Sequence, residues 1–344
     1  MMQISWKIFS LPLASVFTIS KGSFSQRRAM IVQLKQDGCV GYGEATEISY
    51  YGISLDSFTR LLTHHLADLK RIELTSPQDY FTKISGILGH EPFLLSAFDC
   101  AAHDLYGHLN KKPTREMLQI GEPNSFKPTS FTIGIGEINE MIGKIHATPW
   151  PIYKIKLGTD ADVDIVRSLR EETKAILRVD ANEGWTAEET IENGRVMEAL
   201  GVEFIEQPMP RDADDEMGSV LENTSIRFIA DESCQQQKDV TRCKGKYHGI
   251  NIKLMKCGGL TAALSMIEEA RSLGLEIMIG CMTESSIGIS AAAQLIPLVD
   301  YVDLDGAMLI KKDIASGVKF NQGFPVFPDK NGLGCQLLDV DQQA

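Results

Sequence analysis

Short apolar runs separated by longer amphipathic segments fill the chain from about residue 131 onward. The short runs have the length of buried strands, and the segments between them have the 3.6-residue period of helices that cover a sheet. This alternation is typical of successive βα units around a parallel sheet. It predicts eight strands, at residues 131–135, 153–157, 177–182, 203–207, 228–232, 249–254, 276–281 and 301–305.

Eight parallel strands in one α/β segment favour a (β/α)8-type barrel, with the seven-helix form (β/α)7β as the expected variant. We assign it to residues 126–317. A doubly wound open sheet is the alternative, and its fingerprint is a Gly-x-Gly-x-x-Gly turn after the first strand. The nearest match, Gly134-Ile135-Gly136-Glu137, lacks the third glycine. The barrel is therefore the favoured architecture.

Residues 1–125 have a different pattern, with strand-like runs at 4–13 and 30–34, a glycine-rich segment at 41–44, and helical patterns at 55–69 and 92–109. We predict that this part forms an N-terminal α+β capping domain. Residues 318–344 read as a C-terminal tail that returns to it. The total of 344 residues suits one barrel and one smaller domain.

Composition and charge narrow the functional class. A net charge of −12 would repel a phosphate backbone, so we exclude nucleic acid as a partner. The seven cysteines have neither zinc-site spacing nor the pattern of a disulfide framework, which favours a reducing compartment. No run reaches the ~20 apolar residues of a membrane span. We expect a cytoplasmic homo-oligomer that acts on a small molecule and does not bind membranes.

Two lysines share one face of the second predicted barrel strand. Side chains alternate across a strand, so Lys154 and Lys156 point into the barrel while the apolar residues between and beside them face the helices. An edge strand with one solvated face would show the same pattern. The polar residues on the following strands favour the inward arrangement.

Asp180, Glu206 and Asp231 fall at the carboxyl ends of three consecutive predicted strands. Active sites of barrel enzymes lie at this end. Three oxygen ligands without histidine or cysteine favour Mg²⁺ over zinc or copper. We therefore predict a magnesium site that leaves coordination positions for an anionic substrate.

Lys253 on the sixth strand faces inward, and in a closed eight-strand barrel the second and sixth strands are opposite each other. Lys156 and Lys253 can then approach one carbon from opposite sides, so that one removes a proton and the other returns it. Each lysine must be partly neutral to act as a base, so we expect a pKa below the usual value of about 10.4, favoured by the metal and by the neighbouring charge of Lys154. Lys256 lies on the other parity or in the next turn and is given no catalytic role.

These motifs together resemble the muconate-lactonising subgroup of the enolase superfamily, and within it the dipeptide epimerases. The likeness covers nearly the whole chain and rests on Lys154-x-Lys156, Asp180-Ala181-Asn182, Glu206-Gln207-Pro208, Ala230-Asp231-Glu232-Ser233 and the segment 251–259. It implies an isomerase in which Lys156 and Lys253 exchange the α-proton of the C-terminal residue of a dipeptide, with its carboxylate on Mg²⁺.

The segment 280–285 and the pair Asp303-x-Asp305 carry the resemblance to dipeptide epimerases in particular. In that family such an Asp pair holds the ammonium of the N-terminal residue. A structural alternative is that the two acids cap backbone amides. The predicted substrate contacts are Lys154, Thr132, Asn182, Cys281, Met282, Thr283, Asp303, Asp305 and Gly22.

The resemblance also implies two capping loops over the barrel mouth, at residues 20–28 and 48–52. In the Ala-Glu epimerases an arginine of the first loop holds the glutamate side chain, and counting from Phe17 to Val32 places Gly22 there. Glycine offers no charged contact, so small apolar dipeptides such as Ala-Ala are the expected substrates. The alternatives are an L-Ala-D/L-Glu epimerase, an N-acylamino-acid racemase, an o-succinylbenzoate synthase, or a metal-binding barrel without catalysis.

Overall fold

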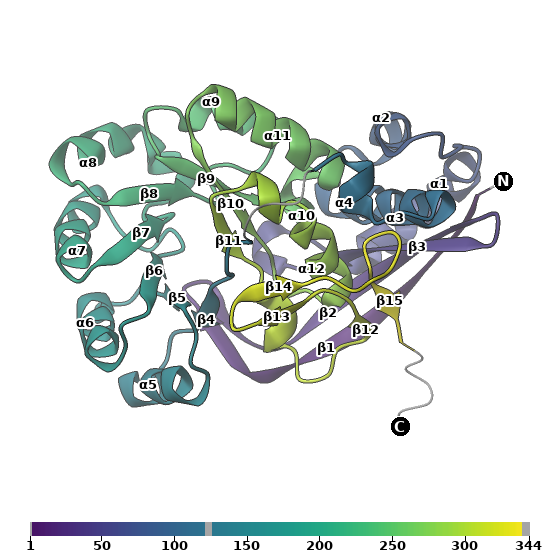
Figure 1. The fold of residues 1–344 in the computed structure, drawn as a ribbon. Helices are drawn as coiled ribbons and strands as arrows, with labels where there is room; N and C mark the ends of the chain where they lie inside the picture. The colour runs from purple at the N-terminus through teal and green to yellow at the C-terminus, as the bar shows by residue number, and fades with distance from the viewer. Residues whose placement is uncertain (1, 121–125, 339–344) are drawn as a thin grey trace.

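The computed structural model describes residues 2–120 and 126–338. Eight parallel strands form one sheet, and each strand neighbours the next one along the chain (Figure 1). All eight predicted strands are confirmed, with ends that differ by at most a few residues. Their bounds are β4 (Phe131–Ile133), β5 (Ile152–Lys156), β6 (Ile176–Asp180), β7 (Val202–Glu206), β8 (Arg227–Ala230), β9 (Gly249–Lys253), β10 (Glu276–Gly280) and β11 (Tyr301–Asp303).

The sheet closes on itself at the start of β4. Thr129 forms a parallel bridge with Val302, and the Ser130 amide donates to the Val302 carbonyl oxygen at 3.1 Å. The first strand thereby meets the last strand, β11. The closed barrel is confirmed, and the open doubly wound alternative is wrong.

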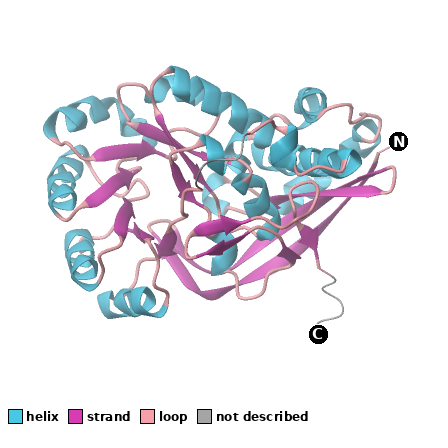
Figure 2. Cartoon of the chain, in the orientation of Figure 1, coloured by secondary structure: helices cyan, strands magenta, loops and turns pink. Residues whose placement is uncertain are grey.

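Helices follow the strands and surround the barrel from outside (Figure 2). In the described part of the chain no α-helix follows β11, which leads only into the short 3₁₀ segment η4 (Gly306–Leu309), as the (β/α)7β form requires. The helical segments are α5 (Ile138–Ala147), α6 (Asp162–Glu172), α7 (Ala187–Ala199), η2 (Arg211–Glu216), α8 (Met217–Asn223), α9 (Gln237–Cys243), α10 (Leu254–Cys257), α11 (Leu260–Ser272), α12 (Ser286–Ala293) and η3 (Ile296–Leu298).

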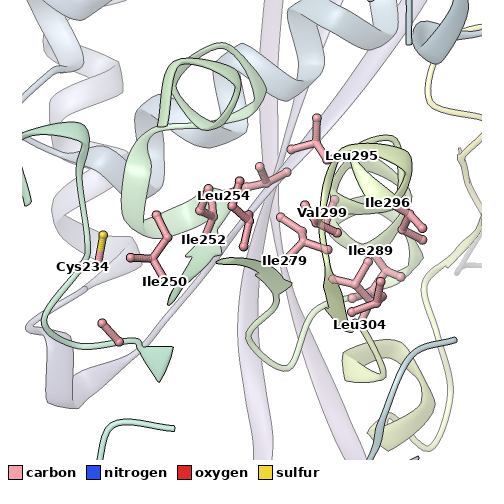
Figure 3. Close-up of a cluster of buried hydrophobic side chains, with 14 of the residues drawn as sticks. Cys234, Ile250, Ile252, Leu254, Ile279, Ile289, Leu295, Ile296, Val299 and Leu304 are labelled. Carbon is pink, nitrogen blue, oxygen red and sulfur yellow. The ribbon is translucent and has the colours of Figure 1, made fainter. Parts of the chain in front are cut away.

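Strand alternation separates apolar side chains from those that carry the chemistry. Ile250 and Ile252 of β9 lie with Ile279 of β10 and Ile289 of α12 in the core between the sheet and its helices (Figure 3). Lys253, one residue beyond Ile252, therefore points into the barrel. The same period of two turns Lys154 and Lys156 inward on β5.

The N-terminal part forms a three-stranded antiparallel sheet covered by helices (Figure 1). The predicted helix at 55–69 is confirmed as α1, and that at 92–109 as α3. The elements are β1 (Gln3–Ile19), β2 (Gly22–Gln36), β3 (Cys39–Thr46), η1 (Ser49–Tyr51), α1 (Leu55–Leu69), α2 (Pro77–Leu88), α3 (Pro92–Asn110) and α4 (Thr114–Met117).

The glycine-rich segment at 41–44 is part of strand β3, packed directly on α3. A Cβ atom at Gly41 would lie 2.3 Å from the Ala101 carbonyl oxygen, and one at Gly43 would lie 1.9 Å from the Ala97 carbonyl oxygen. Only glycine permits this approach, so these residues serve helix packing. The strand itself was not predicted, because glycine is depleted in strands.

One further expectation of the N-terminal part needs correction. The segment 20–28 is mainly strand: Ile19 pairs with Gly22 across a tight hairpin, and β2 begins there. The segment 48–52 contains the 3₁₀ turn η1. The capping segments are therefore a hairpin end and a turn, both held by backbone hydrogen bonds.

The C-terminal segment runs back over the N-terminal part. The Leu333 amide donates to Asp104 of α3, and the Thr114 amide donates to the Gly332 carbonyl oxygen, both at 2.7 Å. The domain boundaries stay a prediction, and residues 121–125 and 339–344 lie outside the described part. The segment contains β13 (Lys319–Asn321), β14 (Phe324–Val326) and β15 (Gln336–Leu337), and β15 pairs with β12 (Ala315–Ser316), which lies just before the segment. Among the described helices, none has the length and apolarity to cross a membrane.

Candidate functional site

Lys156 and Lys253 line the same cavity at the carboxyl ends of the barrel strands. Lys156 ends β5 and Lys253 ends β9, which are four strands apart in the eight-strand order and so face each other across the closed barrel. Both side chains are buried, with 8% and 7% of the residue surface exposed. This is the arrangement in which two bases can reach opposite faces of one atom.

The carboxyl groups of Asp180, Glu206 and Asp231 lie next to the lysines of the barrel and are fully buried. Lys156 contacts Asp180 at 2.6 Å, and Lys253 contacts Asp231 at 2.7 Å. Burial disfavours the charged form of each carboxyl, but the neighbouring lysines outweigh it, so the pKa values of Asp180 and Asp231 are lowered. Both carboxyls are therefore ionised oxygen donors.

Glu206 differs, because burial and the charge of Asp180 raise its pKa to about 7. Its Oε1 accepts a hydrogen bond from the Asn251 amide at 2.8 Å, and its Oε2 lies 2.5 Å from the Lys154 ammonium. In the described residues no three acidic, histidine or cysteine side chains meet closely enough to hold one ion in this arrangement. The ammonium groups of Lys154, Lys156 and Lys253 lie between the carboxylates and provide their counter-charge.

The donor set still fits a hard divalent cation. It consists of three buried carboxylates on the adjacent strands β6, β7 and β8, and Asp180 and Glu206 are partners in the strand register. The lysines that separate them have flexible stems, so a cation of higher charge can replace the ammonium groups as the partner. Asp180, Glu206 and Asp231 are the residues that would hold it.

The backbone next to these carboxyl groups is strained at the ends of β6 and β7. Asn182 has φ 45° and Gln207 has φ 33°, in the left-handed region that non-glycine residues seldom adopt. The Gln207 side-chain oxygen accepts from the amides of Asp231 and Ser233, and its nitrogen donates to the Tyr247 hydroxyl. Strain of this kind persists where surrounding contacts over-determine it, and it clusters at active sites.

The pKa of Lys253 departs from the expectation drawn from sequence. Burial lowers the pKa of an ammonium, but the charge of Asp231 outweighs it, and the pKa of Lys253 is raised. The prediction of a lowered pKa for Lys253 is therefore wrong while its ammonium is paired with Asp231. A cation bound to Asp231 would weaken this ion pair, which links the metal site to the base.

Asp303 and Asp305 face the cavity as predicted. The Lys154 ammonium contacts Asp303 at 2.8 Å, and the Thr132 amide donates to Asp305 at 2.6 Å. Burial and the charge of Asp303 raise the pKa of Asp305 to about 7. Lys154 thus pairs with Asp303 as well as with Asp180 and Glu206.

The cavity gathers most of the predicted site residues and excludes three. Asp180 and Glu206 lie behind the lysines, and Gly22 lies at the exposed end of the hairpin. The predicted residues that line the cavity are Thr132, Lys154, Lys156, Asn182, Asp231, Lys253, Cys281, Met282, Thr283, Asp303 and Asp305.

Counting along the chain put Lys21, Arg27 and Arg28 close to the position of the side-chain-binding arginine but gave that position to Gly22; in the structure Arg27 lines the cavity and Gly22 does not. Its guanidinium stacks on the Phe24 ring with 3.6 Å from Cζ to the ring centroid, the residue is 6% exposed, and its Nε has no hydrogen-bond partner. Burial lowers the pKa of Arg27. The period of two could have found it, because Arg27 shares a strand face with Ala29 and Ile31, which pack on the barrel.

Glu232, Tyr50 and Tyr51 also line the cavity. Burial and the charge of Asp231 raise the pKa of Glu232 to about 8. The Asn182 side-chain amide donates to Glu232 at 3.4 Å. Glu232 directly follows Asp231, a predicted metal ligand. Strand alternation would turn Glu232 away from the barrel, but β8 ends at Ala230, and the turn that follows brings Glu232 to the cavity.

The fold and motifs match known proteins over most of the chain. Residues 140–341 match the family model described as "Enolase C-terminal domain-like". A relative from Maribacter sp., named L-Ala-D/L-amino acid epimerase, is 46% identical over 98% of this chain and 99% of its own length. The L-Ala-D/L-Glu epimerase of Bacteroides thetaiotaomicron is 34% identical over 98% of this chain and 88% of its own length.

A solved structure supports the same assignment. The dipeptide epimerase from Enterococcus faecalis V583, crystallised with Mg and the dipeptide L-Leu-L-Tyr, superposes with a TM-score of 0.91 at 28% identity, over 97% of this chain and 98% of that chain. The match includes both the capping part and the barrel. The chain therefore belongs to the enolase superfamily and, within it, to the dipeptide epimerases, a family of isomerases.

Proposed function

We propose that the enzyme inverts the α-carbon of the C-terminal residue of a dipeptide by a two-base proton transfer that depends on Mg²⁺. The observation that carries this proposal is the position of Lys156 and Lys253, which line one cavity from opposite strands. One neutral lysine removes the α-proton, and the protonated lysine on the other side returns a proton to the opposite face. Either lysine takes either role, according to which stereoisomer is bound.

Mg²⁺ on Asp180, Glu206 and Asp231 would supply charge stabilisation for the substrate carboxylate as it becomes an enolate. The carboxylate set supports this assignment, and the E. faecalis relative is crystallised with Mg. Asp303 and Asp305, which line the same cavity, would hold the ammonium of the N-terminal residue. N-acylamino-acid racemase and o-succinylbenzoate synthase substrates have no such ammonium, so these two acids favour a dipeptide.

The test is proton exchange in heavy water, read by mass spectrometry over a library of dipeptides with and without excess EDTA. We expect deuterium at the C-terminal α-carbon of both product stereoisomers, and loss of exchange on chelation. Full turnover in EDTA after dialysis would contradict the metal requirement. Absence of exchange with every dipeptide would contradict the proposed reaction.

Arg27 favours a second candidate, an epimerase of L-Ala-Glu dipeptides. The expectation of Ala-Ala rested on Gly22, whereas the buried guanidinium of Arg27 faces the cavity with an unpaired Nε. A substrate γ-carboxylate would supply that partner. A buried charged group without a partner would cost several kcal/mol. Relatives of both kinds exist, named for D/L-amino acids and for D/L-Glu.

Arg27→Met separates the two candidates, because methionine keeps the apolar stem and removes the charge. If glutamate is the better substrate, the variant loses roughly a hundredfold in kcat/KM for Ala-Glu and little for Ala-Ala. If Ala-Ala is the better substrate, wild type already prefers it and the variant leaves that preference in place. Arg28→Met is the matched control, because it removes the neighbouring guanidinium, which pairs with Glu47 and does not line the cavity.

A further inference from the structure

A second cavity of about 150 Å³ lies beside the candidate active site. Three residues form the wall between the two cavities. Phe17, Thr132 and Leu309 line both cavities, and we call them the partition. The side cavity beyond it is lined largely by apolar groups, among them Ala14, Val16, Phe131 and Met308. We propose that Phe17 and Leu309 limit the N-terminal side chain of the dipeptide to the size of alanine, and that the side cavity is a preformed extension of this subsite for larger apolar side chains.

The inference rests on the proposed function, in which Asp303 and Asp305 hold the substrate ammonium. The N-terminal side chain is attached to the same carbon as that ammonium, so it must lie next to these acids. Thr132 contacts Asp305 through its amide at 2.6 Å, and η4, which ends at Leu309, begins directly after Asp305. The partition is thus the surface that an N-terminal side chain meets.

The backbone fixes the partition in place. A Cβ atom at Gly134 would lie 3.2 Å from the Phe17 ring, so the ring packs against bare backbone. The Ile135 amide donates to the Thr18 carbonyl oxygen at 2.9 Å and ties this part of β1 to the end of β4. The Phe17 ring therefore rests on the backbone at Gly134, beside the contact between the hairpin and the barrel.

An irregularity in β1 creates the side cavity. The pairing of β1 with β2 shifts register between Pro12 and Phe17, which leaves Ala14 and Val16 outside the ladder. The Lys311 amide donates to the Pro12 carbonyl oxygen at 2.8 Å, so the irregular segment is held against the chain that follows η4. The space between them is lined mainly by apolar groups, and it opens to the surface at Ala14 and Val16, which are exposed.

The experiment varies the N-terminal residue while the C-terminal residue stays alanine. We expect wild type to use L-Ala-L-Ala at least about tenfold better than L-Leu-L-Ala in kcat/KM, because a closed hydrophobic wall rejects extra methylenes by this order. Leu309→Ala or Phe17→Ala opens the partition and raises the Leu/Ala ratio at least about tenfold. Met308→Ala is the matched control, since Met308 lines only the side cavity, and the ratio stays at the wild-type value.

A filling variant tests whether the gain uses the side cavity. Ala14→Phe in the Leu309→Ala background places a ring in that space and should cancel the gain for leucine. Leu309→Val provides a milder opening if Leu309→Ala does not fold, as judged by circular dichroism.

Two results would overturn the inference: equal use of Leu-Ala and Ala-Ala by wild type, or an unchanged ratio in both opened variants that still epimerise Ala-Ala. A protein that epimerises no dipeptide would instead refute the proposed function.

Discussion

Asp231 lies between two lysines that have different surroundings. Its Oδ2 accepts from Lys253 and its Oδ1 accepts from Lys256, at 2.7 and 2.5 Å. Lys256 also donates to three backbone oxygens, those of Asp231, Cys234 and Asn251, and is 1% exposed. Lys253 lines the cavity and Lys256 does not. Lys253 is therefore the lysine that can reach a substrate, while Lys256 holds the Asp231 carboxylate in position.

The two-base arrangement predicts the effect of removing either base. Lys156→Ala and Lys253→Ala should each lower kcat/KM for epimerisation by about 10²–10⁴-fold or more, because a general base contributes on this scale. One variant is expected to retain exchange of the α-proton of one diastereomer with solvent, since the other lysine still reaches one face. Near-normal epimerisation by Lys253→Ala would contradict the model.

Asp303 and Asp305 predict a change in substrate discrimination. Asp303→Asn or Asp305→Asn should lower kcat/KM for a dipeptide more than for its N-acetyl counterpart, because only the dipeptide has an ammonium to pair with a carboxylate. The ratio of the two kcat/KM values is the measurement. If this ratio stays at the wild-type value in both variants, a racemase of acylated amino acids becomes the better assignment.

At the scale of elements, a carboxylate of the capping part caps a barrel helix. Glu44 at the end of β3 is buried and accepts from the amides of Ser285 and Gly288 at 3.0 and 3.1 Å. These amides lie at the N-terminal end of α12, where backbone N–H groups lack partners within the helix and favour an anion. Because Ser285 follows the cavity segment 281–283, this contact joins the capping sheet to the substrate site.

Glu44→Gln should therefore destabilise the protein and loosen the site. The amide retains one acceptor oxygen and loses the other, which leaves a buried N–H unpaired at about 1–3 kcal/mol. We expect a lower urea midpoint and a raised KM for the dipeptide. Glu73→Gln, an exposed change in the same part of the chain, should alter the free energy of unfolding by no more than about 0.5 kcal/mol. An unchanged midpoint in Glu44→Gln would show that the contact contributes nothing to docking.

At the scale of the whole molecule, several buried carboxyls have raised pKa values. Those of Glu206 and Asp305 are about 7, and those of Glu232 and Glu284 are about 8, in each case with burial as the largest cause. The usual values are near 4, so between pH 5 and 8 the folded state binds more protons than the unfolded state. The free energy of unfolding then falls as the pH rises through this window. The lowered pKa values of Asp180 and Asp231 change the free energy of unfolding only below this pH window.

Urea midpoints at pH 5.5 and pH 8, in EDTA and in Mg²⁺, test this prediction. In EDTA the midpoint should be lower at pH 8. Mg²⁺ should raise it more at pH 8 than at pH 5.5, because metal binding requires ionised carboxylates and stabilises the folded state that binds it. Equal midpoints in EDTA and Mg²⁺ at both pH values would argue against a metal site.

The sequence by itself determined the barrel and which polar side chains point into it. Periods of two and 3.6 reflect burial on one face of each element, and eight buried strands in series allow few arrangements. The inward direction of Lys156 and Lys253 follows from the same alternation. The position of Asp180, Glu206 and Asp231 follows from the rule that parallel strands share one carboxyl edge. These inferences need only local geometry, and the structure agrees with each.

Only the tertiary structure decided which residues of the capping part face the site. Counting along the chain selected Gly22, but the register shift in β1 and the hairpin pairing place Arg27 at the cavity instead. The ion pairs also could not be predicted from the sequence. Lys154 of β5 contacts Asp303 of β11 because the barrel closes where the chain at β4 meets β11. Such contacts join residues more than a hundred positions apart, and their geometry depends on bulges, closure and charge balance that no local pattern encodes.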